Sequence, residues 1–329
     1  MDFPSECDLR RRSALLRSHA DLRLLNIADG PASGARIVQA RIPRGLAAEF
    51  ALDRGADLFS LSFRGVEIGW HSAVDGITPW PDLEAEEGLG FLRGFDGFLV
   101  TCGLDHHGVA GTTPADDCCY PLRKRNHQSL HGRISATRAE MTEKVIDWDG
   151  SEIRLRLILR QATVFGEVLE LQRLWRISLD QPVIRLEDRV INRSFRPTRH
   201  GILYHLNLGA PFLGAELRLE ASGWPLAAAL DEDPPIPTDD HVEIVTTAAS
   251  PSDGRVALQN RDLGLRLNLL YEPSTLPVLA MWRAYQSGVF ALGIEPQTTF
   301  ADANAATLAS GERRDYGLAI SMQESILEE

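Results

Sequence analysis

Short runs in which apolar and charged residues alternate constrain the fold of this chain more than any other feature. In residues 153–160 an apolar residue stands at every second position, and arginine stands at most of the positions between. A strand directs successive side chains to opposite faces, so this period of two predicts a strand with one face in the core and one in solvent. Six further strands are expected at 168–177, 183–191, 201–208, 265–270, 289–294 and 316–321.

These strands follow one another without helices between them, which predicts an all-β protein with large antiparallel sheets packed as a sandwich. Helical periodicity is confined mainly to residues 13–25, so we expect a short N-terminal helix that caps the sheets. The 329 residues, 44% of them hydrophobic, suffice for one large core, and no stretch resembles a flexible linker. We expect one domain over residues 1–329, with 1–30 as an N-terminal helical extension.

Charge and hydropathy exclude several classes of partner. The formal net charge of −12 would repel a nucleic-acid backbone. No apolar run approaches the roughly 18 residues of a membrane span, and the charged N-terminus lacks the apolar core of a signal peptide. The expectation is a soluble, cytoplasmic protein with neither a nucleic-acid nor a membrane partner.

Two fragments place polar groups on strand-like runs. In Tyr-His-Leu-Asn-Leu-Gly at 204–209, alternation puts His205 and Asn207 on one face. In Gly-Ile-Glu-Pro-Gln at 293–297, it puts Glu295 and Gln297 together, and the small residues before them would leave room for a ligand. The proline between them cannot donate to a sheet ladder and therefore marks a strand end, an edge or a bulge. Each fragment alone is also explained as a polar tip without function.

Two loop-like segments carry further polar groups. Residues 90–108 combine many glycines with donors and acceptors that include Arg93, Asp96 and His106, a composition suited to a polyhydroxyl ligand. The segment lacks the spacing of a phosphate-binding loop. In Leu-His-Gly at 130–132, the glycine beside His131 would let backbone or ligand approach closely.

The pattern of Asp105, His106, His107 and His131 argues against a metal site. Adjacent histidines on a strand point to opposite faces, and no HExxH motif accompanies them. None of the four cysteines stands in a CxxC pair, and no serine stands in a GxSxG turn. We therefore expect neither a metal nor another cofactor, and no nucleophilic catalysis.

Together, the Leu-His-Gly motif, the Tyr-His-x-Asn-Leu-Gly strand and Leu-Gly-Ile-Glu-Pro-Gln at 292–297 resemble the aldose 1-epimerase (galactose mutarotase-like) superfamily. Gly-Phe-Asp-Gly at 94–97 and Cys-Gly-Leu-Asp-His at 102–106 resemble its DUF4432 branch. The resemblance spans roughly residues 37–321. It implies a β-supersandwich whose large antiparallel sheets form a cleft for a free sugar.

The resemblance also implies roles for particular residues. Glu295 would be the catalytic base, His205 the catalytic acid and His131 a substrate ligand. Asn207 departs from the His-x-x-Phe-Asn spacing of the better-known mutarotases, and their arginine motif is not recognisable, so Arg93 is only a candidate replacement. The remaining expected substrate ligands are Asp96, His106 and Gln297, with Trp282 lining the C–H face of the sugar ring.

The function expected from this reading is interconversion of the anomers of a monosaccharide or sugar derivative. Glu295 and His205, on opposite sides of the ring, would open and close it without metal or cofactor. One alternative is a non-catalytic carbohydrate-binding or sensory domain. Another is an enzyme acting on a phosphorylated or acidic sugar, for which Arg93, Arg133 and Arg283 could bind the anion. The sequence leaves open whether the protein forms a homodimer.

Overall fold

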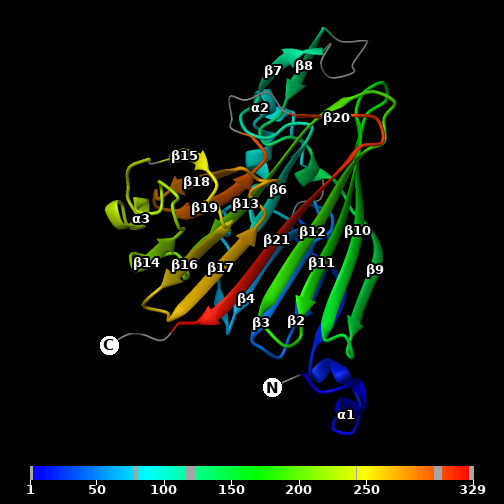
Figure 1. Cartoon of the computed structure of the whole chain (residues 1–329), viewed down its shortest axis with the longest axis vertical. Helices are drawn as coiled ribbons and strands as arrows, with labels where there is room; N and C mark the ends of the chain where they lie inside the picture. The colour runs from blue at the N-terminus through cyan, green and yellow to red at the C-terminus, as the bar shows by residue number, and fades with distance from the viewer. Residues whose placement is uncertain (1–2, 78–80, 116–123, 242, 300–305, 326–329) are drawn as a thin grey trace.

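The architecture of the chain is seen in a computed structural model that describes residues 3–77, 81–115, 124–241, 243–299 and 306–325. Within these ranges the chain forms four sheets, and every strand pairing is antiparallel. Figure 1 shows a long sheet that crosses the molecule diagonally and a second group of strands beside it. The prediction of an all-β protein with large antiparallel sheets is confirmed.

The largest sheet has eight strands in the order β14-β16-β17-β21-β12-β11-β10-β9. It contains most of the strands that the alternating runs predict. Its strands are β9 (Glu140–Asp147), β10 (Glu152–Ala162), β11 (Val168–Ser178), β12 (Val183–Asn192), β14 (Leu217–Glu220), β16 (Arg255–Asn260), β17 (Leu265–Tyr271) and β21 (Arg313–Glu324).

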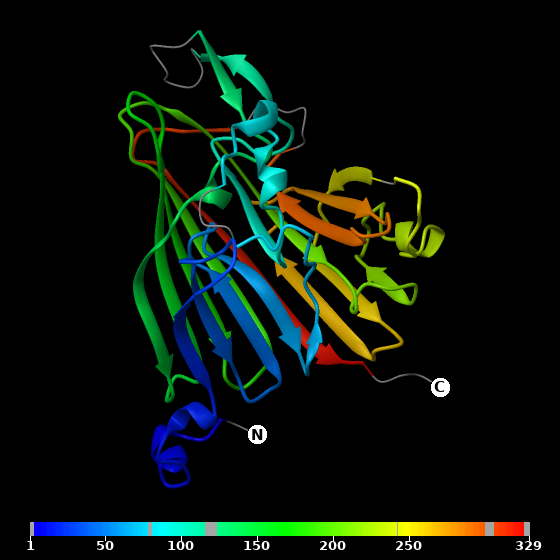
Figure 2. The ribbon, with the colours of Figure 1, turned by 180° about the vertical axis from the view of Figure 1, so that it is seen from behind.

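A five-stranded meander packs against this sheet, as the view from behind shows in blue and cyan (Figure 2). The two sheets share one hydrophobic core, in which the rings of Phe50 and Trp175 lie 5.1 Å apart. The strands of the meander are β1 (Asp21–Asn26), β2 (Arg36–Arg41), β3 (Leu46–Ala51), β4 (Asp57–Phe63) and β5 (Val66–Glu67).

A six-stranded sheet carries the two polar fragments. Its order is β15-β18-β19-β13-β20, and β6 pairs with β13 as well. The strands are β6 (Leu99–Leu104), β13 (Thr198–Leu208), β15 (Glu243–Ala249), β18 (Val278–Ala284), β19 (Ala291–Gln297) and β20 (Ala306–Leu308). The fourth sheet is the hairpin of β7 (Gly111–Pro114) and β8 (Arg125–Gln128), at the top of Figure 1.

In the described ranges helices are few and short. They are α1 (Glu6–Arg10), α2 (Ala85–Gly88), α3 (Ala229–Glu232) and the 3-10 turns η1 (Leu16–Ser18), η2 (Gly90–Arg93) and η4 (Ile134–Ala136). The short N-terminal helix is therefore α1, and the helix expected over 13–25 is wrong. That segment contains η1 and then β1, whose backbone pairs with β2. In β1 only Leu22 packs against the core, whereas Leu24 and Leu25 are exposed. Leu15, part of the helical stripe, is 63% exposed.

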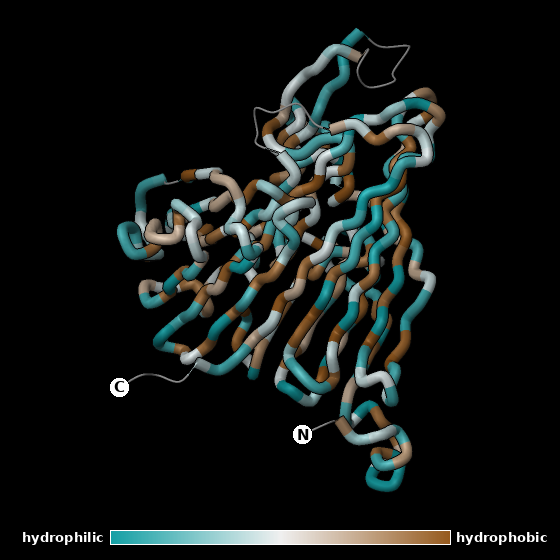
Figure 3. The backbone as a smooth tube through the Cα atoms, in the orientation of Figure 1, coloured by the Kyte–Doolittle hydropathy of each residue, from teal (hydrophilic) through white to brown (hydrophobic). Residues whose placement is uncertain are grey.

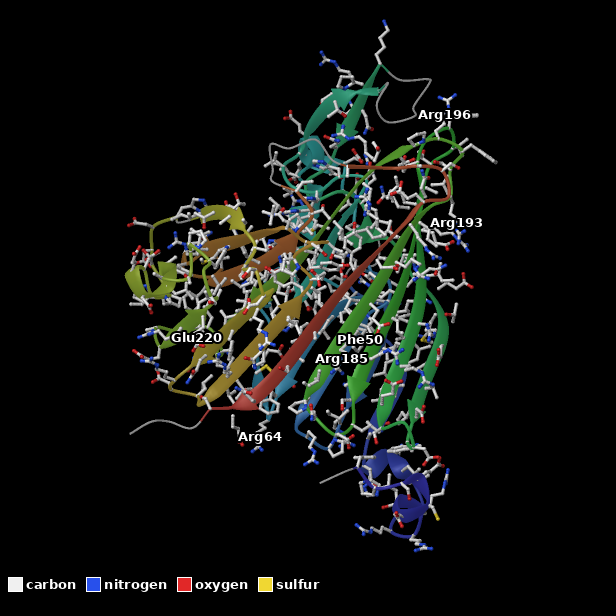
Figure 4. All side chains as sticks on the ribbon, in the orientation of Figure 1. Phe50, Arg64, Arg185, Arg193, Arg196 and Glu220 are labelled. Carbon is white, nitrogen blue, oxygen red and sulfur yellow. The ribbon has the colours of Figure 1, made fainter. Side chains whose placement is uncertain are left out.

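The period-two pattern matches the observed burial. In β10 the residues Ile153, Leu155, Leu157 and Leu159 are buried, and Figure 3 shows brown and teal segments alternating along the strands of the large sheet. Figure 4 labels Arg193 and Arg196 near the upper ends of these strands, where both are exposed. Among the residues that the structure describes, no helix is long and apolar enough to cross a membrane.

Candidate active site

The site is organised by β13, which lies between β6 and β19. Successive side chains of β13 alternate between its two faces, so His205 and Asn207 share the face opposite Tyr204. In the ladder to β19, Leu203 is opposite Gln297 and Leu206 is opposite Ile294. The positions between them are unpaired where β19 carries Pro296, which has no N–H to donate. This register makes His205 and Glu295 cross-strand neighbours.

The side chains of His205 and Glu295 are in contact. His205 Nε2 lies 3.2 Å from Glu295 Oε1, and the two residues are only 3% and 4% exposed. They do not flank a space as wide as a sugar ring, contrary to the expectation that they lie on opposite sides of it. The room expected at Gly293 is also taken, because a Cβ there would lie 2.9 Å from both Glu295 Oε1 and His205 Cε1. Glycine at 293 therefore permits the contact.

Aromatic rings surround His205 and Glu295, and burial among them shifts the pKa of both groups. The rings of Phe95 and Trp282 meet the His205 ring edge-on at centroid distances of 4.9 and 5.4 Å. Burial in these surroundings lowers the pKa of His205 to about 3 and raises the pKa of Glu295 to about 8. Between these values the ligand-free pair holds one proton, and burial favours its neutral form, with the proton on Glu295.

Asn207 and Trp282, both expected near a ligand, adjoin the pair. Asn207 donates from Nδ2 to Gly97 O at 2.9 Å, and its side chain favours the protonated form of His205. Neither Asn207 Oδ1 nor His205 Nδ1 has a partner at full hydrogen-bonding geometry. The Trp282 indole donates from Nε1 to Glu243 Oε1 at 3.1 Å, which fixes the ring beside His205.

His131 approaches the pair from a separate loop. Its ring lies 5.6 Å from the His205 ring, nearly perpendicular to it, and its buried Nδ1 has no partner. The backbone of His131 is left-handed, with φ of 59°. Gly103 N donates to His131 O at 2.9 Å and His131 N donates to Gly108 O at 2.8 Å, which holds this conformation. A strained backbone held in this way is common at functional sites.

The glycine after His131 is required by the same arrangement. Gly132 has φ of 74°, and a Cβ there would lie 2.2 Å from His106 O and 2.4 Å from Gly103 O. No side chain fits at that approach. The Leu-His-Gly motif therefore attaches its loop to the end of β6 and delivers His131 toward β13.

For the other expected ligands the structure gives no contact with His205 or Glu295 among the described residues. Gln297 is buried two residues beyond Glu295 on the same face of β19. Asp96 is buried, and its two carboxylate oxygens accept from Ser72 N and Gly76 N at 2.8 and 2.7 Å. His106 Nε2 lies 2.8 Å from Val109 O. Arg93 is at the surface in an ion pair with Glu86.

His107 was not among the expected ligands, although it lies close to the histidines that were. It is 9% exposed, and its buried Nδ1 has no partner. Alternation along a strand indicates that adjacent histidines face opposite ways. It does not indicate which of them faces the interior.

A separate cleft of about 1160 Å³ lies beside the β7–β8 hairpin. Arg133, Gln128 and Gln161 are among its lining residues, whereas His205 and Glu295 are not. Arg133 forms ion pairs across this region with Glu84 and Asp105. In the part of the chain that the structure describes, no three histidine, cysteine or acidic side chains are grouped to hold a metal ion.

Three solved structures show what kind of protein has this architecture. A candidate aldose 1-epimerase from Klebsiella pneumoniae superposes with a TM-score of 0.81 at 22% identity, over 93% of this chain and 84% of that one. A galactose mutarotase-like protein from Clostridium acetobutylicum gives 0.66 at 14% identity, over 93% and 99%. Galactose 1-epimerase from Lactobacillus acidophilus gives 0.58 at 14% identity, also over 93% and 99%. The fold is galactose mutarotase-like, which confirms the predicted supersandwich.

The family is established by sequence. Residues 32–322 match the family model of DUF4432, described as a domain of unknown function, and the chain belongs to that family. A search of curated proteins found no significant match. Membership confirms the resemblance drawn from the motifs, and the identities to solved structures support the fold alone.

Proposed function

We propose that this protein interconverts the anomers of a free sugar, with His205 and Glu295 as its acid/base pair. The observation that carries the proposal is the buried 3.2 Å contact between His205 Nε2 and Glu295 Oε1 within a galactose mutarotase-like fold. Two titratable groups, each buried without the compensation that a structural ion pair would receive, are typical of an active site. A sugar hydroxyl would supply the partner that His131 Nδ1 lacks.

The contact geometry suits the chemistry of ring opening. The C1 hydroxyl must lose a proton while the ring oxygen gains one, and both oxygens are bonded to the same carbon. An acid and a base that act on them must therefore present their atoms side by side. Neighbouring strands with an interrupted ladder hold His205 and Glu295 in that relation. The sugar would meet the pair with its C1 edge and need not lie between the two residues.

The proton that the reaction needs is already in the pair. In the ligand-free site it resides on Glu295, whose pKa burial raises to about 8. Transfer to His205 Nε2 creates the Glu295 carboxylate and the His205 imidazolium, which the family resemblance assigns as base and acid. Sugar hydroxyls around the pair would stabilise these charges, since hydrogen bonds to a charged form favour it.

Turnover then follows from these two groups. Glu295 takes the C1 hydroxyl proton as His205 gives its proton to the ring oxygen, and the ring opens. Rotation about the C1–C2 bond and reversal of both transfers close the ring as the other anomer. His205 and Glu295 return to their starting protonation, with no net exchange of protons with solvent.

The pairing of the three arginines that could bind an anion favours a neutral sugar over a phosphorylated or acidic one. Arg93 is paired with Glu86, Arg133 with Glu84 and Asp105, and Arg283 with Asp233 at 2.7 Å. A phosphate would have to displace these carboxylates. Monosaccharides without a charged group are thus the first substrates to examine.

Glu295→Gln tests the proposal directly. It removes the carboxyl proton and the base while keeping the shape, and we expect anomer exchange to fall about 10²- to 10⁴-fold, the usual contribution of an acid/base group. Exchange would be measured by two-dimensional NMR on a panel of neutral aldoses that includes glucose, galactose, mannose and arabinose. The wild-type rate should also decline as pH rises through about 8, where the pair loses its shared proton.

Glu187→Gln, on the exposed face of β12, is the matched control and should leave exchange unchanged. Circular dichroism would confirm that both variants fold. Equal exchange rates in Glu295→Gln and the wild type, on an aldose that the wild type turns over, would refute the assignment. Binding of an aldose by the wild type without faster exchange would instead support a non-catalytic sugar-binding domain.

A further inference from the structure

His107 is held by hydrogen bonds on one side of its ring and is unpartnered on the other. Its Nε2 lies 3.2 Å from Thr298 Oγ1 and 3.1 Å from Thr299 Oγ1, directly after the end of β19. Its Nδ1 is buried and has no partner. A buried polar atom without a partner costs about 1–3 kcal/mol, so a ligand that supplies one would be favoured.

The position of His107 relates it to the proposed catalytic pair. The ring packs over Gly201 of β13, where a Cβ would lie 2.8 Å from His107 Cδ2. Gly201 and His205 are four residues apart and share a face of β13, so their Cα atoms are about 13 Å apart. His131 is near both residues, because its N donates at 2.8 Å to the O of Gly108, the residue after His107, and its ring lies 5.6 Å from that of His205. His107 and His131 therefore approach the face of β13 that carries Gly201 and His205.

The hydrogen bonds fit a tautomer of His107 that carries its hydrogen on Nε2. Thr298 Oγ1 donates to Ile202 O at 3.3 Å and accepts from Ile202 N at 3.1 Å, which leaves it as an acceptor for Nε2. Thr299 Oγ1, 3.1 Å from the same nitrogen, can accept from it as well as donate. In this tautomer Nδ1 has a lone pair that accepts a hydrogen bond.

We propose that His107 is a substrate-binding residue whose Nδ1 accepts a hydrogen bond from a hydroxyl at the end of the sugar remote from the reacting carbon. This inference rests on the proposed sugar site and extends it to substrate selection. Burial lowers the pKa of His107 to about 3, so the ring is neutral near pH 7. A neutral acceptor recognises a hydroxyl and provides no charge for a phosphate.

Two substitutions separate ligand binding from a structural role. His107→Gln can place its amide near the position of Nε2, keeping the link to Thr298 and Thr299 while losing the Nδ1 acceptor. His107→Asn can place its amide near the position of Nδ1, keeping that acceptor while losing the link. If Nδ1 binds the sugar, His107→Gln should weaken binding about five- to tenfold, the value of one hydrogen bond, and His107→Asn about twofold or less.

Affinities would be measured by isothermal titration calorimetry and saturation-transfer NMR with glucose, galactose, mannose, arabinose and glucose 6-phosphate. His19→Gln, in the N-terminal segment where His19 Nε2 contacts Ser13 Oγ at 2.9 Å, is the control and should bind as the wild type does. Equal losses in both His107 variants, or a larger loss in His107→Asn, would overturn the proposal. So would binding of glucose 6-phosphate in preference to glucose.

A measurement on the wild type covers the case in which neither variant folds. Nitrogen-15 NMR of the histidine rings should show the Nδ1 resonance of His107 moving when a binding aldose is added, and the absence of any shift across the panel would overturn the proposal. Failure of the proposed function is distinguishable. If an aldose shifts the Nδ1 resonance but its anomers do not exchange faster, the proposed catalysis is contradicted and the His107 contact is retained. If the protein exchanges anomers fast and His107→Gln binds the aldose with normal affinity, the His107 contact is contradicted and the proposed catalysis is retained.

Discussion

Tyr204 and His205 are adjacent on β13 and belong to two buried polar regions that differ in one respect. On the Tyr204 side, Arg173 lies between Asp188 and Asp57, and the Tyr204 hydroxyl donates to Asp188 Oδ2 at 2.8 Å. On the other side, His205 contacts Glu295 among aromatic rings. The first region uses its hydrogen-bonding groups fully, whereas the second retains buried atoms without partners.

The Arg173 network shows what a saturated buried ion cluster looks like. The guanidinium donates to both Asp188 oxygens at 2.9 and 2.7 Å, to Asp57 Oδ1 at 2.8 Å, to Gly55 O at 2.8 Å and to Thr101 Oγ1 at 2.8 Å. These bonds join the five-stranded, six-stranded and eight-stranded sheets. A charge cluster that is complete in this way stabilises the fold and has no capacity left for a ligand.

Burial alone does not distinguish the two regions, because both are nearly inaccessible to solvent. What distinguishes the His205 region is that unpaired atoms belong to adjoining titratable groups, since a protein tolerates their cost where a ligand will pair with them. Each of the following experiments would break or sharpen this distinction.

The largest effect is expected from Arg173→Met. It leaves Asp57 and Asp188 buried without their counter-ion, and removal of one partner of a buried ion pair costs about 3–5 kcal/mol. We expect the free energy of unfolding in urea to fall by that amount. Arg189→Met is the control, because the Arg189–Asp315 pair is exposed and screened by solvent, so its loss should change stability little. Similar losses in both variants would contradict the assigned role of the network.

The sequence predicts these two regions to different extents. Period-two alternation places His205 and Asn207 on one face, and Glu295 and Gln297 on one face, as the structure shows. It cannot show that β13 and β19 are neighbours in a register that brings His205 to Glu295, because pairing joins segments far apart in the chain. The Arg173 network escaped prediction for the same reason, since Asp57, Thr101 and Asp188 come from three other strands.

The contacts of the expected substrate ligands also depend on residues that the local sequence does not identify. His131 could be singled out by its motif, but its left-handed backbone depends on bonds to Gly103 and Gly108. The chemistry of Arg93 and Asp96 in a glycine-rich segment makes them candidate ligands. Local composition does not reveal that Arg93 pairs with Glu86, or that Asp96 accepts hydrogen bonds from backbone amides. Their role as substrate ligands stays a prediction.

A smaller effect concerns stability and pH. The pKa of Glu295 is raised in the folded state from 4.5 to about 8, so the folded state retains a proton that the unfolded state has released. The resulting stability is present below pH 4.5 and is lost as pH rises through about 8. The pKa of His205 is depressed from 6.5 to about 3, so its contribution is present above pH 6.5 and is lost as pH falls toward 3. Between pH 6.5 and 8 mainly the Glu295 contribution changes.

Glu295→Gln removes that contribution. Over this interval the wild type should lose up to about 2 kcal/mol relative to Glu295→Gln, at about 1.4 kcal/mol for each pH unit. Urea unfolding of both proteins at pH 6.5 and 8 gives the difference, in which the titration of other groups cancels. Glu187→Gln, at a partly paired surface carboxylate, should follow the wild type. A constant difference between Glu295→Gln and the wild type would contradict a neutral buried pair.

The smallest effect should come from Gly293→Ala, which tests whether the contact between the two proposed catalytic groups is required. A methyl group at 293 would lie 2.9 Å from Glu295 Oε1, 2.9 Å from His205 Cε1 and 3.1 Å from Trp282 Cβ, so the side chains of His205 and Glu295 must move apart. Misplacement of reacting groups lowers the rate, and we expect anomer exchange to fall about tenfold. Gly317→Ala in β21 is the matched control, because a Cβ there would meet only Leu186 O, at an ordinary 3.6 Å. If Gly293→Ala exchanges anomers as fast as the wild type, displacement of His205 from Glu295 does not affect the reaction. That result would contradict a catalytic role for the pair, and the contrast between the two faces of β13 would then say nothing about function.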